Sequence, residues 1–240
     1  MCYYRYVERK VSFVQGEYYH VYNRGVEKRI IFTNNYDYNR FILLLHVLNT
    51  NKNLKIRDLL RGNSFNELLK IKNDDPIIAI GAYCLMSNHF HLLITPLVDG
   101  GIPKFMLKLQ TAYSMYFNNK NKREGALFQG VFKSHHLDTD EYLRYIYSYI
   151  HLNPAKLKDK DWKKRRAKDF SSLREFILDY KYSSMSEYIK GDFIITNPIA
   201  FPSYVENYKS KKEYFETMIN DWLDYKEITQ DAQGNPVLLF

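Results

Sequence analysis

Hydrophobic and polar positions along the chain follow the periods of strands and helices in turn. Short runs rich in Tyr, Val and Ile, bounded by Gly, Asn or Asp, predict strands. The most apolar stretch, residues 76–96, is too long for one strand, and Ser87-Asn88 in its middle indicates a turn between two antiparallel strands. The predicted strands are 17–24, 77–86, 89–95 and 127–137.

Apolar residues recur at helical spacing in the segments between these strands. In residues 102–119 they form one face, and Pro103 suits the first turn of a helix. A later helix has its N-cap in the Asp-Thr-Asp run at residues 138–140 and ends at Asn153-Pro154. The predicted helices are 35–49, 102–119, 141–152, 171–177 and 204–225, and the Asn- and Lys-rich residues 50–75 are predicted to be an insertion containing one helix.

The order of these elements, β-α-β-β-α-β-α, predicts an α+β fold. Without its last helix it is the split βαβ arrangement of ferredoxin-like and RRM-like domains, an antiparallel sheet with helices on one face. We therefore expect a first domain over residues 1–155, with its insertion at about 50–75. A basic segment and a mainly helical C-terminal extension would follow over residues 156–240.

Charge narrows the classes of function. The 240 residues carry a formal net charge of +8, and residues 156–168 hold eight basic side chains against two acidic ones. From residue 203 onward the balance reverses, with seven acids against four lysines. Such segregation is expected when part of a chain faces nucleic-acid phosphates. Tyrosines on a basic surface, drawn from the 22 in the chain, would offer stacking planes for bases.

Cysteine use and hydropathy indicate the compartment. The two cysteines, Cys2 and Cys84, form no CxxC pair, which is typical of a reducing environment. We find no apolar run as long as a signal peptide or a membrane span requires. The sequence therefore predicts a soluble, cytoplasmic protein.

His89-Phe90-His91 is a candidate metal-binding motif. Side chains alternate between the faces of a strand, so the two imidazoles point the same way while Phe90 points into the core. Two such imidazoles can share one ion, although a pair of satisfied surface histidines is the common alternative. A zinc hydrolase of the HxHxDH type is disfavoured, because Leu93 and Ile94 stand where it needs an acid and a third histidine.

The predicted helix 141–152 carries tyrosines at helical spacing. Tyr149 and Asn153 lie on one face, and Tyr147 and His151 form a second such pair on another face. Tyrosines spaced like this usually belong to a core. Opposite an HxH strand they also have a chemical use, in which an ion polarises a phosphodiester and the phenolate attacks it. Periodicity alone leaves both tyrosines open.

Several motifs together resemble the HUH single-tyrosine transposases of insertion sequences, and specifically their REP-associated tyrosine transposase (RAYT) relatives. The resemblance covers roughly residues 18–190. Its motifs are Tyr19-His20-Val21, Arg24-Gly25, Ile31-Phe32, Arg40-Phe41, residues 86–93 (MSNHFHLL), 125–130 (GALFQG), 132–134 (FKS), 149–154 (YIHLNP) and 182–184 (YSS) with Tyr188. The insertion at 50–75 and the acidic tail depart from the family pattern.

The resemblance implies a metal-dependent transposase that cleaves and rejoins single-stranded DNA near hairpins through a 5′-phosphotyrosine. The family's histidine pair falls on His89 and His91, its nucleophile on Tyr149 and its third metal ligand on Asn153. The expected cofactor is Mg²⁺ or Mn²⁺, of which Mn²⁺ accepts imidazoles more readily. A monomer is favoured over a dimer.

Basic side chains are the candidates for contacts with DNA phosphates. They are Arg24, Lys104, Lys108, Lys122, Arg123 and Lys133, together with Lys163, Lys164, Arg165 and Arg166.

Two alternative functions are compatible with the same fold. One is a non-catalytic nucleic-acid-binding module that stacks bases on an open sheet face, against which the two histidines on that face count. The other is a domesticated hairpin-binding protein that no longer cuts, against which the complete set of site residues counts.

Overall fold

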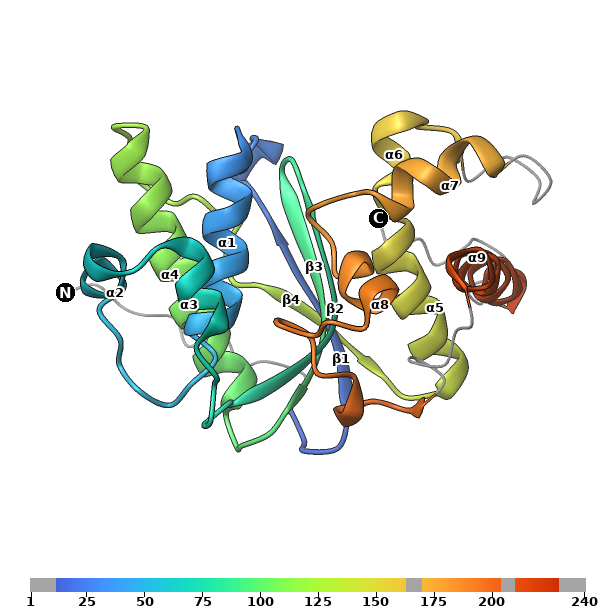
Figure 1. Ribbon diagram of the computed structural model, residues 1–240, viewed down its shortest axis with the longest axis horizontal. Coiled ribbons are helices and arrows are strands. Elements are labelled where there is room, and N and C mark those ends of the chain that lie inside the picture. The colour runs from blue at the N-terminus through green and yellow to red at the C-terminus, as the bar shows by residue number, and fades with distance from the viewer. Residues whose placement is uncertain (1–11, 163–169, 204–209, 229–240) are drawn as a thin grey trace.

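A four-stranded antiparallel sheet runs through the middle of the molecule (Figure 1). The structure, a computed structural model, describes residues 12–162, 170–203 and 210–228. The strand order is β2-β3-β1-β4 and all neighbours are antiparallel, as the split βαβ prediction requires. The strands are β1 (Tyr18–Arg24), β2 (Ile78–Met86), β3 (His89–Pro96) and β4 (Lys133–Leu137).

Helices cover both faces of this sheet. Helices α1 and α4 lie on one face with α2 and α3 beside them, and α5 lies on the other face among α6 to α9 (Figure 1). None of the helices in the described part of the chain combines the length and apolar character needed to cross a membrane. The helices are α1 (Asn35–Val47), α2 (Ile56–Gly62), α3 (Phe65–Lys70), α4 (Gly101–Lys120), α5 (Asp140–Leu152), α6 (Ala155–Lys158), α7 (Ser171–Leu178), α8 (Met185–Lys190) and α9 (Lys211–Ile228), with 3₁₀ turns η1 (Val26–Lys28) and η4 (Pro198–Ala200).

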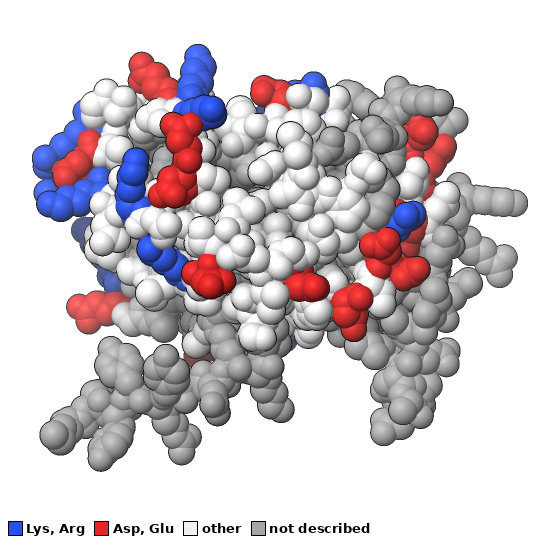
Figure 2. Space-filling model, turned by 90° about the horizontal axis from the view of Figure 1, so that it is seen from below, with Lys and Arg blue, Asp and Glu red and all other residues white. Residues whose placement is uncertain are grey.

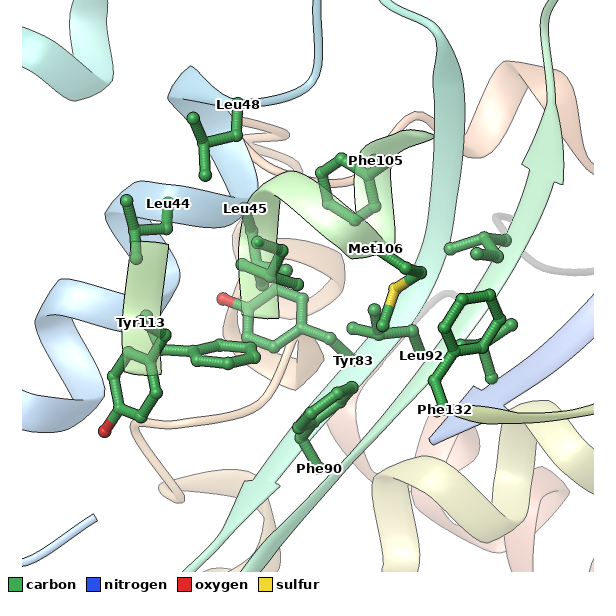
Figure 3. Packing of buried hydrophobic residues seen from close by; sticks show 14 of the residues in the cluster. Leu44, Leu45, Leu48, Tyr83, Phe90, Leu92, Phe105, Met106, Tyr113 and Phe132 are labelled. Atoms are coloured by element: carbon green, nitrogen blue, oxygen red, sulfur yellow. The ribbon is translucent and has the colours of Figure 1, made fainter. Parts of the chain in front are cut away.

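The side chains of alternate strand residues form an apolar layer under α1 and α4. Phe90 and Leu92 of β3 are fully buried on this side, which confirms the prediction that Phe90 points into the core. Figure 3 shows them in one layer with Leu44 of α1 and with Phe105 and Tyr113 of α4. The intervening residues of β3, among them the two histidines, therefore face the other side of the sheet.

Helix α5 is enclosed between the second face of the sheet and α9. Ile146 and Ile150 are fully buried in an apolar cluster that includes residues of β2 and β3 and Met218 of α9. Farther out, the rings of Trp162 and Trp222 lie 4.8 Å apart between their centres. Packing on two sides holds α5 in a fixed position against the strands.

The C-terminal extension also pairs with the outer strand of the sheet. The backbone N–H of Leu85 donates to the carbonyl of Tyr182 at 2.9 Å, and that of Ser184 donates to the carbonyl of Tyr83 at 3.0 Å. An exposed edge strand would present unpaired backbone groups to other chains, and these bonds occupy part of the β2 edge.

Two local predictions were wrong. Strand β4 begins at Lys133, whereas the pattern predicted a strand from residue 127. Gly130 has a φ of 67°, a left-handed conformation that interrupts an extended strand. The insertion holds two short helices where one was predicted, because Ser64 and Glu67 form a capping box that starts α3 as a separate helix. The predicted helix 204–225 corresponds to α9, and residues 204–209 lie outside the described part.

A buried carboxylate joins α1 to α4. Asp37 accepts hydrogen bonds from the backbone N–H of Thr33 at 2.8 Å, the Thr33 hydroxyl at 2.6 Å, the Tyr116 hydroxyl at 2.8 Å and the Lys120 ammonium at 2.6 Å. Burial raises the pKa of this carboxyl, but the four donors outweigh burial and hold the pKa below its usual value.

We expect Asp37→Asn to lower the free energy of unfolding by about 2 kcal/mol at neutral pH, since charge-assisted hydrogen bonds are lost. The depressed folded-state pKa makes this stabilisation complete above the unfolded value of about 3.9 and removes it as the pH falls through the folded value. Urea unfolding at pH 7 and pH 3 should show a smaller difference between variant and wild type at pH 3. The exposed Asp58→Asn is the control, and an equal difference at both pH values would contradict the assignment.

Candidate active site

The two histidines of β3 lie on the face that α5 covers. The ring centres of His89 and His91 are 5.0 Å apart and the rings are nearly perpendicular. The Nδ1 atom of each ring is hydrogen-bonded. His89 Nδ1 lies 2.6 Å from Asn88 Oδ1, and His91 Nδ1 lies 2.9 Å from His20 Nε2. The Nε2 atom of each imidazole therefore lies on the side of the ring away from that bond.

Tyr149 of α5 lies beside this pair. Its ring is buried and its centre is 5.4 Å from that of His91, edge to face. Burial raises the pKa of the phenol above its usual value, and a hydrogen bond from the Asn153 side chain opposes that rise. Asn153, one turn later, is also buried, and its Oδ1 has no hydrogen-bond partner among the described residues. The structure thus brings together the four residues to which the resemblance gives roles.

The alternative pair on α5 faces elsewhere. The hydroxyl of Tyr147 is hydrogen-bonded to the Tyr214 hydroxyl of α9 at 2.5 Å, and His151 Nε2 to the Ser184 hydroxyl at 2.7 Å. Burial lowers the pKa of His151 to about 3, so the ring is neutral. Tyr147 and His151 therefore join α5 to the C-terminal extension, and it is Tyr149 that approaches the HxH strand.

A pocket of about 190 Å³ opens beside the two histidines. Four of its lining residues are cations, and none of the described residues that line it is acidic. The lining consists of Arg24, Lys28, Lys133 and Lys156, with Tyr22, Asn23, Asn88, His89, His91 and Gln129. Four cations in the lining of one pocket favour an anionic ligand such as a phosphodiester.

Lys156 connects the pocket to the tyrosine. Its ammonium lies 5.4 Å from the centre of the Tyr149 ring, and burial lowers the pKa of this lysine. Burial, with help from the charges of Lys156 and Arg24, lowers the pKa of His89 to about 4, so that histidine is neutral and able to act as a ligand. The sequence placed Lys156 only within a basic segment; its position three residues after Asn153 was the signal that it belongs to the site.

His20 is a second residue that the sequence analysis left without a role. It stands on β1 next to β3, is fully buried and contacts His91 directly. Burial, followed by the charge of His135, lowers the pKa of His20 to about 3. The sequence signal for this role was its place in the Tyr-His-Val motif of β1. His20 lies opposite Leu93 of β3, on the face of the sheet that carries the histidine pair.

The candidate phosphate contacts fall into different regions. Arg24 and Lys133 line the pocket, with the Arg24 guanidinium hydrogen-bonded to Gln129. Lys104 and Lys108 belong to α4, on the opposite face of the sheet, where their ammonium groups bind the Asn51 side chain and backbone carbonyls of the insertion. These two lysines therefore hold the insertion against α4.

The remaining candidates lie after α4 or outside the described part. Lys122 is exposed, and Arg123 donates to Asn118 at 2.6 Å in the turn that ends the helix. Residues 163–166, with Lys163, Lys164, Arg165 and Arg166, are among those that the structure does not describe. Figure 2 shows most of its Lys and Arg side chains on the left, the side of α2 to α4, where several acidic side chains lie among them, and mostly acidic side chains on the right.

The possible metal ligands are few. The described residues contain no group of three or more His, Cys, Asp or Glu side chains able to hold an ion. The imidazoles of His89 and His91 offer two nitrogens, and Oδ1 of Asn153, which has no partner among the described residues, offers one oxygen. This mixed donor set fits Mn²⁺ or Mg²⁺ when further oxygens, such as those of a phosphate, complete the shell.

Comparisons with known proteins identify the family of this chain. Residues 13–153, more than half of the chain, match the family model described as IS200-like transposase. No curated protein matches the sequence. Among solved structures, the chain is similar to a REP-associated tyrosine transposase bound to a REP hairpin, at 14% identity over 85% of this chain and 95% of that one, with a TM-score of 0.43. The family match establishes that the chain belongs to the IS200-like transposases.

Proposed function

We propose that this chain is a metal-dependent transposase that cleaves and rejoins single-stranded DNA, with Tyr149 as its nucleophile. The observation that carries the proposal is the juxtaposition of a buried tyrosine, a histidine pair whose His91 ring centre is 5.4 Å from that of the tyrosine, and a pocket lined by four cations. None of the described residues that line this pocket is acidic, so none of them would repel a DNA phosphate that approaches the phenol. The neighbouring tyrosine, Tyr147, is committed to Tyr214.

The proposed reaction exchanges one phosphoester for another. The Tyr149 hydroxyl loses its proton and attacks phosphorus, the bond from phosphorus to the 3′ oxygen breaks, and that oxygen leaves as a 3′ hydroxyl after taking up a proton. The 5′ phosphate stays on Tyr149. A 3′ hydroxyl then gives up its proton and attacks the phosphotyrosine, and the bond from phosphorus to the Tyr149 oxygen breaks. The tyrosine oxygen takes up a proton and a DNA strand is restored, so no nucleotide is hydrolysed.

Charge around the phenol makes the first step feasible. Burial opposes ionisation of Tyr149, so a positive charge close to the phenol is needed. Lys156 is the cation placed over the ring, and Asn153 bonds to the hydroxyl. His89, His91 and Asn153 would hold Mg²⁺ or Mn²⁺, which supplies polarisation of the phosphodiester.

Finer features of the proposal rest on the resemblance of the motifs to REP-associated transposases. We propose on that basis a hairpin beside the cleaved strand, a monomeric enzyme and a catalytic unit over residues 1–155. The basic residues Lys163, Lys164, Arg165 and Arg166 follow the tyrosine helix and are proposed to contact DNA phosphates.

We expect Tyr149→Phe to abolish the covalent protein–DNA adduct, because the substitution removes the attacking oxygen and leaves the ring. Labelled single-stranded DNA with Mn²⁺, followed by denaturing gel electrophoresis, measures the adduct. Tyr147→Phe is the matched control and should keep the adduct while losing about 1 kcal/mol of stability with its hydrogen bond to Tyr214. An adduct that persists in Tyr149→Phe and disappears in Tyr147→Phe would reverse the assignment.

Removal of the ion should stop the same reaction. Excess EDTA, His89→Ala and His91→Ala should each eliminate the adduct, while Asn153→Ala should be milder because water can replace a neutral oxygen ligand. DNA affinity measured in EDTA separates loss of binding from loss of chemistry. Full activity in EDTA would exclude the metal mechanism and leave a protein-only phenol chemistry.

Pocket cations should contribute to the salt dependence of DNA binding. The double variant Arg24→Gln/Lys133→Gln should lower the slope of log affinity against log salt for a single strand by about 1.4, or about 0.7 for each phosphate contact. Lys55→Gln/Lys70→Gln, on the insertion beyond the opposite face of the sheet, should leave the slope unchanged. Fluorescence anisotropy across a salt series measures both, and equal slopes in the two variants would show that the pocket does not hold the strand.

A further inference from the structure

We propose that His20 is a positioning residue that orients the His91 ring and keeps its Nε2 lone pair available to a metal ion. The inference rests on the proposed function, because it concerns the same metal site. His20 touches neither DNA nor the ion in this proposal and acts only through His91. It extends the site from β3 to the neighbouring strand β1.

The surroundings of His20 hold its ring in one orientation. It lies on β1, between β3 and β4, and is fully buried. Its ring centre is 5.1 Å from that of His91, with 23° between the planes, and 5.1 Å from that of Tyr22. The rings of His135 and Tyr149 lie at 6.4 Å and 6.0 Å. A ring enclosed by four others cannot turn without displacing them.

The hydrogen bond between the two imidazoles determines which nitrogen of His91 can bind an ion. His20 Nε2 lies 2.9 Å from His91 Nδ1, so one of the two atoms must carry the shared proton. A neutral His91 that binds an ion through Nε2 keeps its own proton on Nδ1, and His20 Nε2 must then accept it. Histidine ligands commonly donate their second N–H to a carboxylate or a carbonyl, and here a neutral imidazole takes that place.

A packing role alone accounts poorly for a histidine at this position. The Nδ1 atom of His20 is buried and has no hydrogen-bond partner among the described residues. A buried polar atom in that state destabilises the fold, whereas phenylalanine would fill a similar volume without such an atom. The bond to His91 is the contact of His20 that a phenylalanine could not supply.

The test uses two substitutions that separate the ring from the hydrogen bond. His20→Phe keeps an aromatic ring and removes the acceptor, whereas His20→Gln removes the ring and keeps an amide oxygen near the position of Nε2. Mn²⁺ is titrated into each full-length protein without DNA, and the free ion is measured by electron paramagnetic resonance. His91→Ala defines loss of the site, and Phe41→Leu, buried on the opposite face of the sheet, controls for general loosening of the core.

We expect His20→Phe to weaken Mn²⁺ binding by roughly 10- to 100-fold and His20→Gln to stay near wild type. Melting temperatures in EDTA should show all variants folded; should His20→Phe fail to fold, the smaller His20→Leu takes its place. Wild-type affinity in His20→Phe, with binding lost in His91→Ala, would overturn the positioning role and leave the metal site intact. Equal weakening in His20→Gln and His20→Phe would also overturn it. If His91→Ala binds Mn²⁺ like wild type, the metal site itself is wrong and the inference falls with it.

Discussion

The packing of α5 across the second face of the sheet determines where Tyr149 lies relative to the histidines. Burial of Ile146 and Ile150 seats the helix against β2 and β3, and α9 packs on its outer side. Neither contact involves a reacting group, yet a rotation of α5 by one residue, about 100°, would carry Tyr149 away from His91. The C-terminal extension is therefore part of the site's construction, because it encloses the helix that presents the phenol.

Local patterns predicted the elements of the candidate site, and tertiary contacts distinguish its two tyrosine pairs. The period of two placed His89 and His91 on one face, and Thr139 caps α5 as the sequence indicated. The period of 3.6 gave two equivalent tyrosine pairs, since nothing local distinguishes Tyr147 from Tyr149. What separates them is Tyr214, 67 positions along the chain, which binds the Tyr147 hydroxyl.

Contacts between distant segments also explain what the sequence did not predict. The place of His20 in the Tyr-His-Val motif puts it on the face of the histidine pair, but the sequence does not show its contact with His91, because the two residues lie 71 positions apart. Lys156 belongs by sequence to a strongly basic segment, and the fold places its ammonium over the Tyr149 ring. Strand β4 begins at Lys133 and not at residue 127, because the left-handed backbone of Gly130 interrupts an otherwise favourable apolar pattern.

The positive charges of the pocket couple the binding of its two proposed ligands, the metal ion and the DNA phosphate. Burial and the charges of Lys156 and Arg24 keep His89 neutral, which preserves its lone pair, but those charges also repel any cation that approaches. A phosphate bound among Arg24, Lys133 and Lys156 would cancel that repulsion and add oxygen ligands to a shell that the protein leaves incomplete. Binding free energies are reciprocal, so an ion that is held more tightly with DNA present must hold the DNA more tightly in turn. The proposed site, with its pocket lined by four cations, would therefore bind the ion weakly by itself and bind the ion and the phosphate strongly together.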